Sequence, residues 1–330
     1  MNKTFQTLLI FAVCLMLIPT FILLNKGIST LFKNSERETL LSTDCKEVSI
    51  LNTDTKDIAI MDIKDYLIWN VMAQIPATFE KEALKAQVVL SHTYIINRYI
   101  SEKESPRKNL LGAIISNDDT LYPKSFTTDE AKEYYGDKYE TALRNVTNAV
   151  EEVANEICIY ENQPIVVAYH TISCGKTESS KDIWGEDVPY LVSVDSTSDE
   201  KAEGFSKTTT VSAKDFKENA EKTFSVTLSD NSEEWIKVIE ETKNGTPLTV
   251  SLGGKEIQAS ELYSALNLPS QHFEIQIKDG NINFQTKGIG HLVGMSQYGA
   301  NSLAKEGKSY KEILDYYFPK TEIFTFKQKS

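Results

Sequence analysis

The sequence predicts an α+β protein in which an N-terminal membrane anchor precedes one domain with mostly antiparallel strands and a variable lobe. An uncharged apolar run at Thr7–Leu24 indicates the anchor. Strong helix formers from Phe79 onward indicate one long helix. Short strand patterns separated by tight turns, without any βαβ repeat, indicate antiparallel pairing rather than a parallel α/β sheet.

The apolar run Thr7–Leu24 has 18 residues, within the roughly 17 to 25 residues that span a bilayer. A cleavable signal peptide typically has a shorter apolar core, and no A-x-A-like cleavage site follows Leu24. We therefore expect an uncleaved anchor over residues 1–24. A polar juxtamembrane linker over residues 25–55 and a folded domain over residues 56–330 complete the expected organisation.

The segment from Ile75 to Tyr94 predicts a helix that continues to about Ile100. Helical spacing from Glu82 gives the small or apolar positions Ala86, Val89, Thr93, Ile96 and Ile100. The Glu82 carboxyl group should thus be partly desolvated, which raises a carboxyl pKa toward the value that a general acid needs. The alternative is that Glu80 and Glu82 only complement the helix dipole.

The remaining elements follow from local signals. The expected elements are helices at Ala142–Ala154, Ala213–Thr223, Asn301–Glu306 and Tyr310–Tyr317, and strands at Ile157–Tyr160, Pro164–Tyr169, Leu248–Leu252, Glu256–Gln258 and on both sides of Asp279-Gly280. Gly307 is placed as a helix C-cap, and Ser309 with Glu312 forms a capping-box pattern. Residues 201–283 contain few recognisable motifs and form the expected variable lobe.

The run Gly290–Ala300, GHLVGMSQYGA, places a histidine, a hydroxyl, an amide and a phenol among three glycines. Glycines at this density allow positive φ and a close approach of the backbone to a ligand. The run predicts a tight turn next to helices that carries polar side chains. A purely structural joint is the alternative reading of the same pattern.

Charge and cysteine content exclude several function classes. The formal net charge of −12, without a cluster of Lys and Arg, argues against a nucleic-acid partner. Cys14 and Cys45 precede the expected domain, which leaves Cys158 and Cys174 as a possible disulfide pair. A zinc site of His170, Cys174 and Cys158 would lack a C-x-x-C pair, so we expect no metal and no cofactor.

Three blocks in order resemble the family of stage II sporulation protein D. They are EALKAQ from Glu82 followed by SHTY at Ser91–Tyr94, YHTISCGKTES from Tyr169 followed by WG and by PYL and SVDS, and GHLVGMSQYGA from Gly290. The resemblance spans about Ile60 to Phe318. It implies a membrane-anchored lytic transglycosylase that cleaves peptidoglycan glycan strands, between N-acetylmuramic acid and N-acetylglucosamine, during engulfment in endospore formation.

Three positions depart from the family pattern. Gln74 stands where the family usually has Glu, His92 where it usually has Arg, and Leu292 where it usually has Gly. These departures leave open whether catalysis is intact.

The resemblance and the residue chemistry together give the expected site. Glu82 is the expected catalytic acid, because it lies in the matched helix. The expected substrate-binding residues are His170, Ser173, Lys176, Thr177, Glu178, Trp184, His291, Ser296, Gln297 and Tyr298. Because the chain is acidic, it would hold a glycan by aromatic stacking and hydrogen bonds in a cleft, with Tyr190 as a further aromatic candidate. The block from His170 to Glu178 and the turn from Gly290 to Gly299 should meet in one groove with the start of the Glu82 helix.

The expected partners are peptidoglycan glycan strands, other membrane-anchored engulfment proteins and the membrane itself through residues 7–24. The expected location is the cell membrane, with a single pass and the C-terminal domain outside the cytoplasm. Lys3 favours a cytoplasmic N-terminus, Lys26 and Lys33 weaken that charge asymmetry, and the resemblance supports the orientation.

Three functions remain open at this point. The first is the lytic transglycosylase, and the second is a wall-binding or scaffolding paralogue without catalysis. The third is a muramidase-type hydrolase with two carboxylates. A transglycosylase can work with one carboxyl group, and the motif blocks offer Glu82 with no obvious second acid except Glu178 and Asp195.

Overall fold

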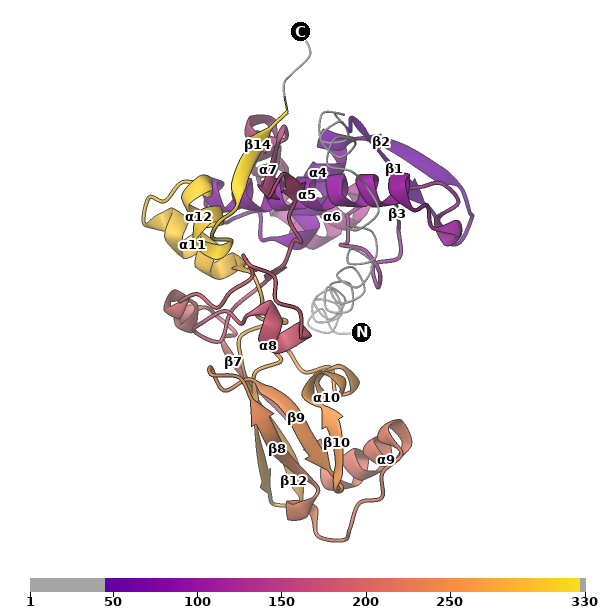
Figure 1. The fold of residues 1–330 in the computed structure, drawn as a ribbon, viewed down its shortest axis with the longest axis vertical. Coiled ribbons are helices and arrows are strands. Elements are labelled where there is room, and N and C mark those ends of the chain that lie inside the picture. Colours follow the sequence, from indigo (N-terminus) through magenta and orange to yellow (C-terminus); the bar gives the residue numbers. More distant parts are fainter. Residues whose placement is uncertain (1–44, 327–330) are drawn as a thin grey trace. The chain divides into compact units, whose positions relative to one another are not determined.

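A computed structural model describes residues 45–326, and the expected anchor and most of the expected linker lie outside the described residues. The described chain forms two compact units, shown in Figure 1. The helical unit contains residues 45–168 and 300–326, and the motif unit contains Tyr169–Gly299. Each unit is considered by itself.

The helical unit combines helices with two small sheets. Its elements are β1 (Glu47–Leu51), β2 (Ile58–Asp62), α4 (Ile63–Gln74), α5 (Lys81–Glu104), β3 (Ile115–Ser116), α6 (Thr128–Tyr135), α7 (Tyr139–Val153), β4 (Glu156–Tyr160), β5 (Gln163–Pro164), α12 (Tyr310–Tyr317) and β14 (Glu322–Thr325). The sheet orders are β2-β1-β3 and β14-β4-β5. Helix α5 lies at the centre, because α4, α7, α12 and β4 all pack against it.

Central packing explains why α5 is buried on most of its surface, polar residues such as Gln87 and Asn97 included. The stripe predicted below Glu82 is buried along its whole length, from Ala86 to Ile100. Leu84, Val88 and Ile95 on other faces are buried as well. A helix that is buried all round lies inside a core rather than on its surface. The helix also continues to Glu104, one turn beyond the predicted end.

The motif unit carries most of the antiparallel strands. Its elements are β6 (Tyr169–His170), α8 (Ser180–Trp184), β7 (Ser206–Ser212), α9 (Ala213–Phe224), β8 (Ile236–Glu241), β9 (Pro247–Leu252), β10 (Lys255–Gln258), α10 (Ala259–Ala265), β11 (Phe273–Lys278), β12 (Asn281–Lys287) and β13 (Met295–Ser296), and α11 (Gln297–Lys305) crosses the boundary between the units. The sheet orders are β10-β9-β8, β11-β12-β7 and β13-β6. Ring contacts of Phe216 with Trp235 and Phe284 hold α9 against this lobe.

The α+β class with mostly antiparallel sheets is confirmed. Hairpins form across Gly253-Gly254 and Asp279-Gly280 as predicted, and Ser309 with Glu312 forms a complete capping box at α12. Helix α11 begins at Gln297, four residues earlier than predicted. The end of the glycine-rich run is therefore the first turn of a helix.

The linker prediction is wrong at its C-terminal end. Strand β1 begins at Glu47 and pairs with both β2 and β3, so ordered structure starts inside the range 25–55. Val48 and Leu51 are buried by this pairing, which is the reason that the segment is not a free linker. Among residues 45–326, no helix combines the length and the apolar character that a membrane crossing requires.

Candidate functional site

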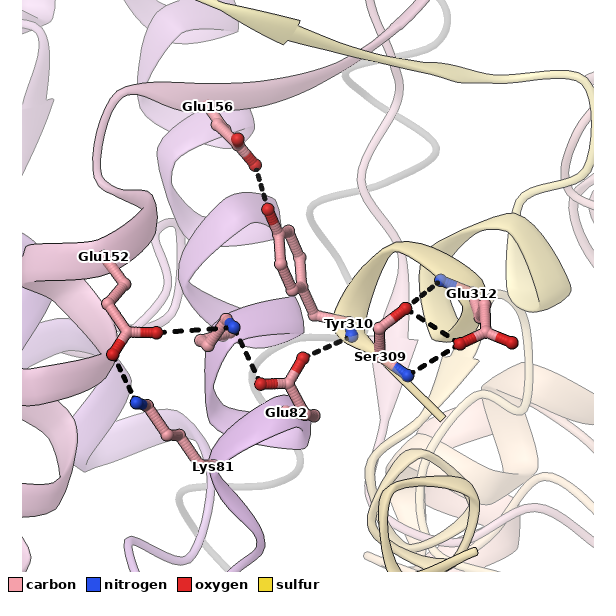
Figure 2. A network of polar contacts seen from close by, with 8 residues as sticks. Lys81, Glu82, Glu152, Glu156, Ser309, Tyr310 and Glu312 are labelled. Carbon is pink, nitrogen blue, oxygen red and sulfur yellow. Dashed lines mark hydrogen bonds and ion pairs between the residues drawn. The ribbon is translucent and has the colours of Figure 1, made fainter. Parts of the chain in front are cut away.

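Glu82 lies in the first turn of α5, where its carboxylate joins two helices of the helical unit (Figure 2). Oε1 accepts a hydrogen bond from Lys85 Nζ at 2.7 Å, and Oε2 accepts one from the backbone N–H of Tyr310 at 2.8 Å. Tyr310 is the first residue of α12, so the negative charge also faces the N-terminus of that helix. The Glu82 side chain is 29% exposed.

Two more carboxylates, of Glu152 and Glu156, belong to the same network (Figure 2). Lys85 Nζ lies 3.4 Å from Glu152 and 4.4 Å from the centre of the Tyr310 ring. The Tyr310 hydroxyl donates to Glu156 Oε2 at 2.7 Å, and Lys81 forms an ion pair with Glu152. Burial, followed by the hydrogen bond with Glu156 and the charge of that carboxylate, raises the pKa of Tyr310. The phenol is therefore a neutral donor at pH 7.

In this network Glu82 links two helices and keeps acceptor sites that a substrate can use. It ties α5 to α12, because it accepts from residues in both helices. Each carboxylate oxygen has two lone pairs, so each Glu82 oxygen keeps a site for a substrate hydroxyl or a proton. The dipole alternative from the sequence stays a prediction, and the helix N-terminus that the Glu82 carboxylate contacts is that of α12.

Gln74 is buried in the last turn of α4. Its Nε2 donates to the carbonyl oxygen of Lys124 at 2.8 Å, and Asn70 Nδ2 donates to the same oxygen at 3.0 Å. An ionised carboxylate has no proton to donate to this carbonyl. The amide at this position thus fastens the loop before α6 to α4.

In the motif unit, the blocks around His170 and Gly290 meet, as the sequence analysis expected. Strands β6 and β13 pair in parallel, with His170 opposite Ser296. The approach is so close that a Cβ on Gly290 would lie 2.9 Å from the Cβ of His170, and a Cβ on Gly288 would lie 2.7 Å from the carbonyl oxygen of Ile172. Both glycines also have positive φ. They are needed for this contact.

His170, His291 and Trp184 form an aromatic cluster inside this junction. The His291 ring centre lies 5.8 Å from that of His170 and 5.5 Å from that of Trp184. His170 Nδ1 lies 3.1 Å from the Val293 carbonyl oxygen, and His291 Nδ1 accepts from the Val293 N–H at 3.1 Å. A neutral His170 therefore carries its proton on Nδ1 and a neutral His291 on Nε2, so one residue's backbone fixes both tautomers.

Burial lowers the pKa of His170 to about 3, with His291 as a second cause, and lowers the pKa of His291 to about 4. Neither Nε2 atom has a hydrogen-bond partner among the described residues. Both rings are therefore neutral at pH 7. A neutral buried imidazole can serve as a donor or an acceptor but cannot form an ion pair.

The histidine pair predicts a loss of stability in mild acid. Because the folded-state pKa values lie below the ordinary value of 6.5, the unfolded chain binds more protons as the pH falls from 6.5 toward 4. Each ring should remove up to about 1.4 kcal/mol of unfolding free energy per pH unit over that window. Denaturant unfolding of the wild type and of His170→Gln/His291→Gln measures the difference. If the unfolding free energy of the wild type and of the double variant changed equally with pH below 6.5, the prediction would be contradicted.

Asp199 joins Ser173 and Ser296 and was missed by the sequence analysis. Its Oδ2 accepts from the Ser173 N–H at 2.7 Å, from the Ser296 hydroxyl at 2.5 Å and from the Ser196 hydroxyl at 3.2 Å. Asp199 is 1% exposed, and burial raises the pKa of its carboxyl group. A local S-x-x-D spacing from Ser196 was the available signal, but nothing in it indicates the contacts with the other two blocks.

Glu178 serves a different part of the same unit. It is fully buried and accepts from the side chains of Thr242 at 2.9 Å, Thr246 at 2.6 Å and Asn244 at 3.1 Å. Burial raises the pKa of Glu178. Thr246 also lies 3.1 Å from His272 Nδ1, and its only proton is donated to Glu178, so the imidazole is the donor in that contact. Glu178 thus organises the loop at 242–246.

The other predicted site residues differ in exposure. Seven of the ten predicted substrate-binding residues are buried, namely His170, Ser173, Thr177, Glu178, His291, Ser296 and Gln297. Trp184 and Tyr298 are half-buried, and Lys176 is exposed. Thr177 bonds within its own block, since its hydroxyl donates to the carbonyl of Val192 and accepts from the N–H of Val194. The motif unit therefore brings His170, Ser173, Trp184, His291 and Ser296 together, whereas a groove shared with Glu82 stays a prediction.

Cys45, Cys158 and Cys174 are free thiols, so the disulfide considered for Cys158 and Cys174 is not formed. Cys158 is completely buried in β4, and burial raises its pKa. Burial also raises the pKa of Cys174 to about 11. Among residues 45–326, no three His, Cys, Asp or Glu side chains are grouped closely enough to hold a metal ion.

Comparisons with known proteins show the family to which this chain belongs. A family model described as stage II sporulation protein, SpoIID, matches residues 51–160. Stage II sporulation protein D of Bacillus subtilis is 35% identical over 263 residues, which is 79% of this chain and 74% of the relative, and that of Bacillus amyloliquefaciens is 32% identical over 262 residues, also 79% and 74%. The chain belongs to this sporulation protein family.

A more distant relative carries a different name. A Bacillus subtilis protein named amidase enhancer is 26% identical over 304 residues, which covers 77% of this chain and 39% of that protein.

Proposed function

We propose that this protein is a membrane-anchored lytic transglycosylase that cleaves peptidoglycan glycan strands during engulfment. A role in sporulation follows from the family. The anchor over residues 7–24 would hold the folded part outside the cytoplasm, beside its wall substrate and other anchored engulfment proteins.

The observation that carries the proposal is the Glu82 carboxylate, which is partly exposed and held by one donor on each oxygen. In the proposed reaction, a proton on Glu82 passes to the glycosidic oxygen as the bond from that oxygen to C1 of N-acetylmuramic acid breaks. The 6-hydroxyl oxygen of the same sugar then bonds to C1, and its proton returns to Glu82. One carboxyl group completes the cycle, and the product is a 1,6-anhydro sugar.

Mass spectrometry of the products tests this proposal. Purified glycan strands incubated with the protein should release fragments that end in anhydro-muramyl residues, which are lighter than hydrolytic ends by one water. Hydrolysed reducing ends without anhydro sugar would favour the two-carboxylate hydrolase instead. Glu156, whose carboxylate accepts from the Tyr310 hydroxyl, is a candidate for its second acid.

Gln74 supports a second candidate, a paralogue that binds the wall or helps another enzyme without cleaving glycan. The amide is used as a donor to Lys124, a role that the usual family carboxylate cannot fill while ionised. The name of the amidase enhancer is compatible with such a helper. If the protein is such a paralogue, the wild type should bind glycan strands without cleaving them.

The variant Gln74→Glu separates the two candidates. If the lost carboxylate is the proton donor, the variant should gain cleavage that the wild type lacks, and if Glu82 is the donor, the wild type should cleave unaided. In either case the new carboxylate faces the Lys124 carbonyl oxygen, so we expect a loss of about 1–3 kcal/mol of stability at pH 7. The loss should shrink as the pH falls, since a protonated Glu can donate again. Denaturant unfolding at several pH values measures it.

Gln276→Glu is the matched control, because that side chain is exposed in β11. Its stability should change little. An unchanged stability of Gln74→Glu at pH 7 would show that the Lys124 contact contributes nothing.

A further inference from the structure

Asn301 of α11 holds the start of α5 with one end of its side-chain amide. Its Oδ1 accepts a hydrogen bond from the backbone N–H of Glu80 at 2.8 Å. Because a backbone N–H donates to an oxygen, this contact decides which end of the amide points toward Glu80. Glu80 is the N-cap residue of α5, and its own side chain makes no capping bond. The Asn301 amide is therefore oriented by the residue just before the helix that carries Glu82.

The other end of the Asn301 amide, Nδ2, is an unused donor. It donates to none of residues 45–326, although Asn301 is only 7% exposed. The fold does not enclose this atom as it encloses the unpartnered Nε2 of His170, so Nδ2 reaches the solvent. Its two N–H groups are held in place by the contact of Oδ1 with Glu80. An oxygen of a ligand can bond to them at little cost in ordering.

Asn301 and the Glu82 carboxylate lie at the same end of α5. Glu82 follows Glu80 by two residues, so their Cα atoms are at most about 7.6 Å apart. Tyr310, the first residue of α12, donates its N–H to Glu82 Oε2 at 2.8 Å. The successive helices α11 and α12 thus both contact the first turn of α5 and the residue before it. A sugar residue bound at Glu82 therefore lies within reach of Nδ2.

The surroundings of this donor favour a neutral acceptor. Lys81 forms an ion pair with Glu152, and Lys85 pairs with both Glu152 and Glu82. Glu80 forms no ion pair within residues 45–326, so three carboxylates face two ammonium groups and would repel an added anion. The N-terminus of a helix nevertheless attracts an electron-rich oxygen. A neutral carbonyl oxygen meets both conditions, and in a strand of amino sugars the acetamido group carries one.

We infer that Asn301 is a substrate-binding residue, whose Nδ2 donates a hydrogen bond to an acetamido carbonyl oxygen of the glycan strand beside Glu82. This bond holds one sugar of the strand at the start of α5 and so brings a neighbouring glycosidic oxygen to the Glu82 carboxyl group. The inference rests on the proposed glycan substrate and deepens it, because it names a group that recognises the amino sugar.

Asn301→Asp tests the donor without removing the acceptor. The probe is the β-1,4-linked N-acetylglucosamine tetramer, which is uncharged, and its binding to the whole chain is measured by calorimetry. Asp keeps an oxygen for the Glu80 N–H but has no N–H group to donate. The affinity for the probe should therefore fall about tenfold, the scale expected for one lost hydrogen bond. The midpoint of denaturant unfolding should stay close to that of the wild type.

Two further variants separate binding from folding. Asn301→Ala removes both ends of the amide, so it should weaken binding as much as Asn301→Asp does. It should also lower the unfolding midpoint, because the Glu80 N–H loses its acceptor. Asn109→Asp makes the same chemical change at an exposed asparagine beyond the other end of α5, a helix of 24 residues and thus about 36 Å long. It should alter neither quantity.

Cellotetraose, which lacks acetamido groups, tests the kind of acceptor. It should bind at least tenfold more weakly than the probe, and Asn301→Asp should not reduce its affinity further. Three results would each overturn the inference: wild-type affinity for the probe in Asn301→Asp, an equal loss of affinity for both oligomers in that variant, or no binding of the probe to the wild type.

Cleavage of purified glycan strands distinguishes a failure of this inference from a failure of the proposed function. If the wild type cleaves and Asn301→Asp has an unchanged KM, the contact with Asn301 is disproved and the transglycosylase stands. If the probe binds with the expected dependence on Asn301 but no strand is cleaved, the transglycosylase is disproved and the substrate-binding residue stands.

Discussion

Glu82→Gln is expected to lower glycan cleavage by at least 100-fold, the scale expected for the loss of a positioned general acid and base. The amide retains the shape of the side chain but cannot supply or recover the proton. It also offers one acceptor where Lys85 and the Tyr310 N–H now use two oxygens, so about 1 kcal/mol of stability should be lost. Product release and denaturant unfolding measure the two effects.

Glu152→Gln is the matched control for this variant. Glu152 also contacts Lys85, but it is more exposed, and its two ion pairs are with Lys81 and Lys85 of α5. Its substitution should change the charge of the network and leave cleavage within a few-fold of the wild type. Wild-type turnover in Glu82→Gln would show that the acid has been misassigned, and the neighbouring Glu80 would be tested next.

The sequence predicts best those features that depend on residues close together in the chain. The capping box of Ser309 and Glu312 and the hairpin at Gly253-Gly254 need only a few residues each, and both are present as expected. Strand β7, with sequence SKTTTVS, was missed because its polar residues show no alternation. It is a strand because it pairs with β12 along its whole length.

The site shows the same limit more sharply. The sequence places Glu82 at the start of a helix, but its contact with Tyr310 crosses 228 positions of the chain and has no local signature. The family departures become interpretable only with contacts. Leu292 stands where the family usually has Gly, and its φ is 67°. The leucine therefore occupies the left-handed conformation, at a cost of about 1–2 kcal/mol. His92 is buried, with Nδ1 3.0 Å from the Glu156 carbonyl oxygen.

Asp199 joins the two sequence blocks of the motif unit, although it lies outside both of them. Ser173 and Ser296 lie in the two recognisable blocks of the motif unit, yet the atom that connects them is Oδ2 of an aspartate outside both. All three donors converge on this oxygen, and Oδ1 has no partner among the described residues. The junction therefore depends on one acceptor.

Asp199→Ala is expected to destabilise the protein by about 3–5 kcal/mol, the scale for breaking a buried charged hydrogen-bond network. The substitution leaves the Ser173 N–H and two hydroxyls buried without their acceptor. Asp199→Asn should cost much less, because its amide oxygen can take the place of Oδ2. Asp187→Ala, at an exposed aspartate in the same unit, should change stability by less than about 0.5 kcal/mol. Denaturant unfolding ranks the three, and equal losses for Asp199→Ala and Asp187→Ala would show that the junction does not depend on this carboxylate.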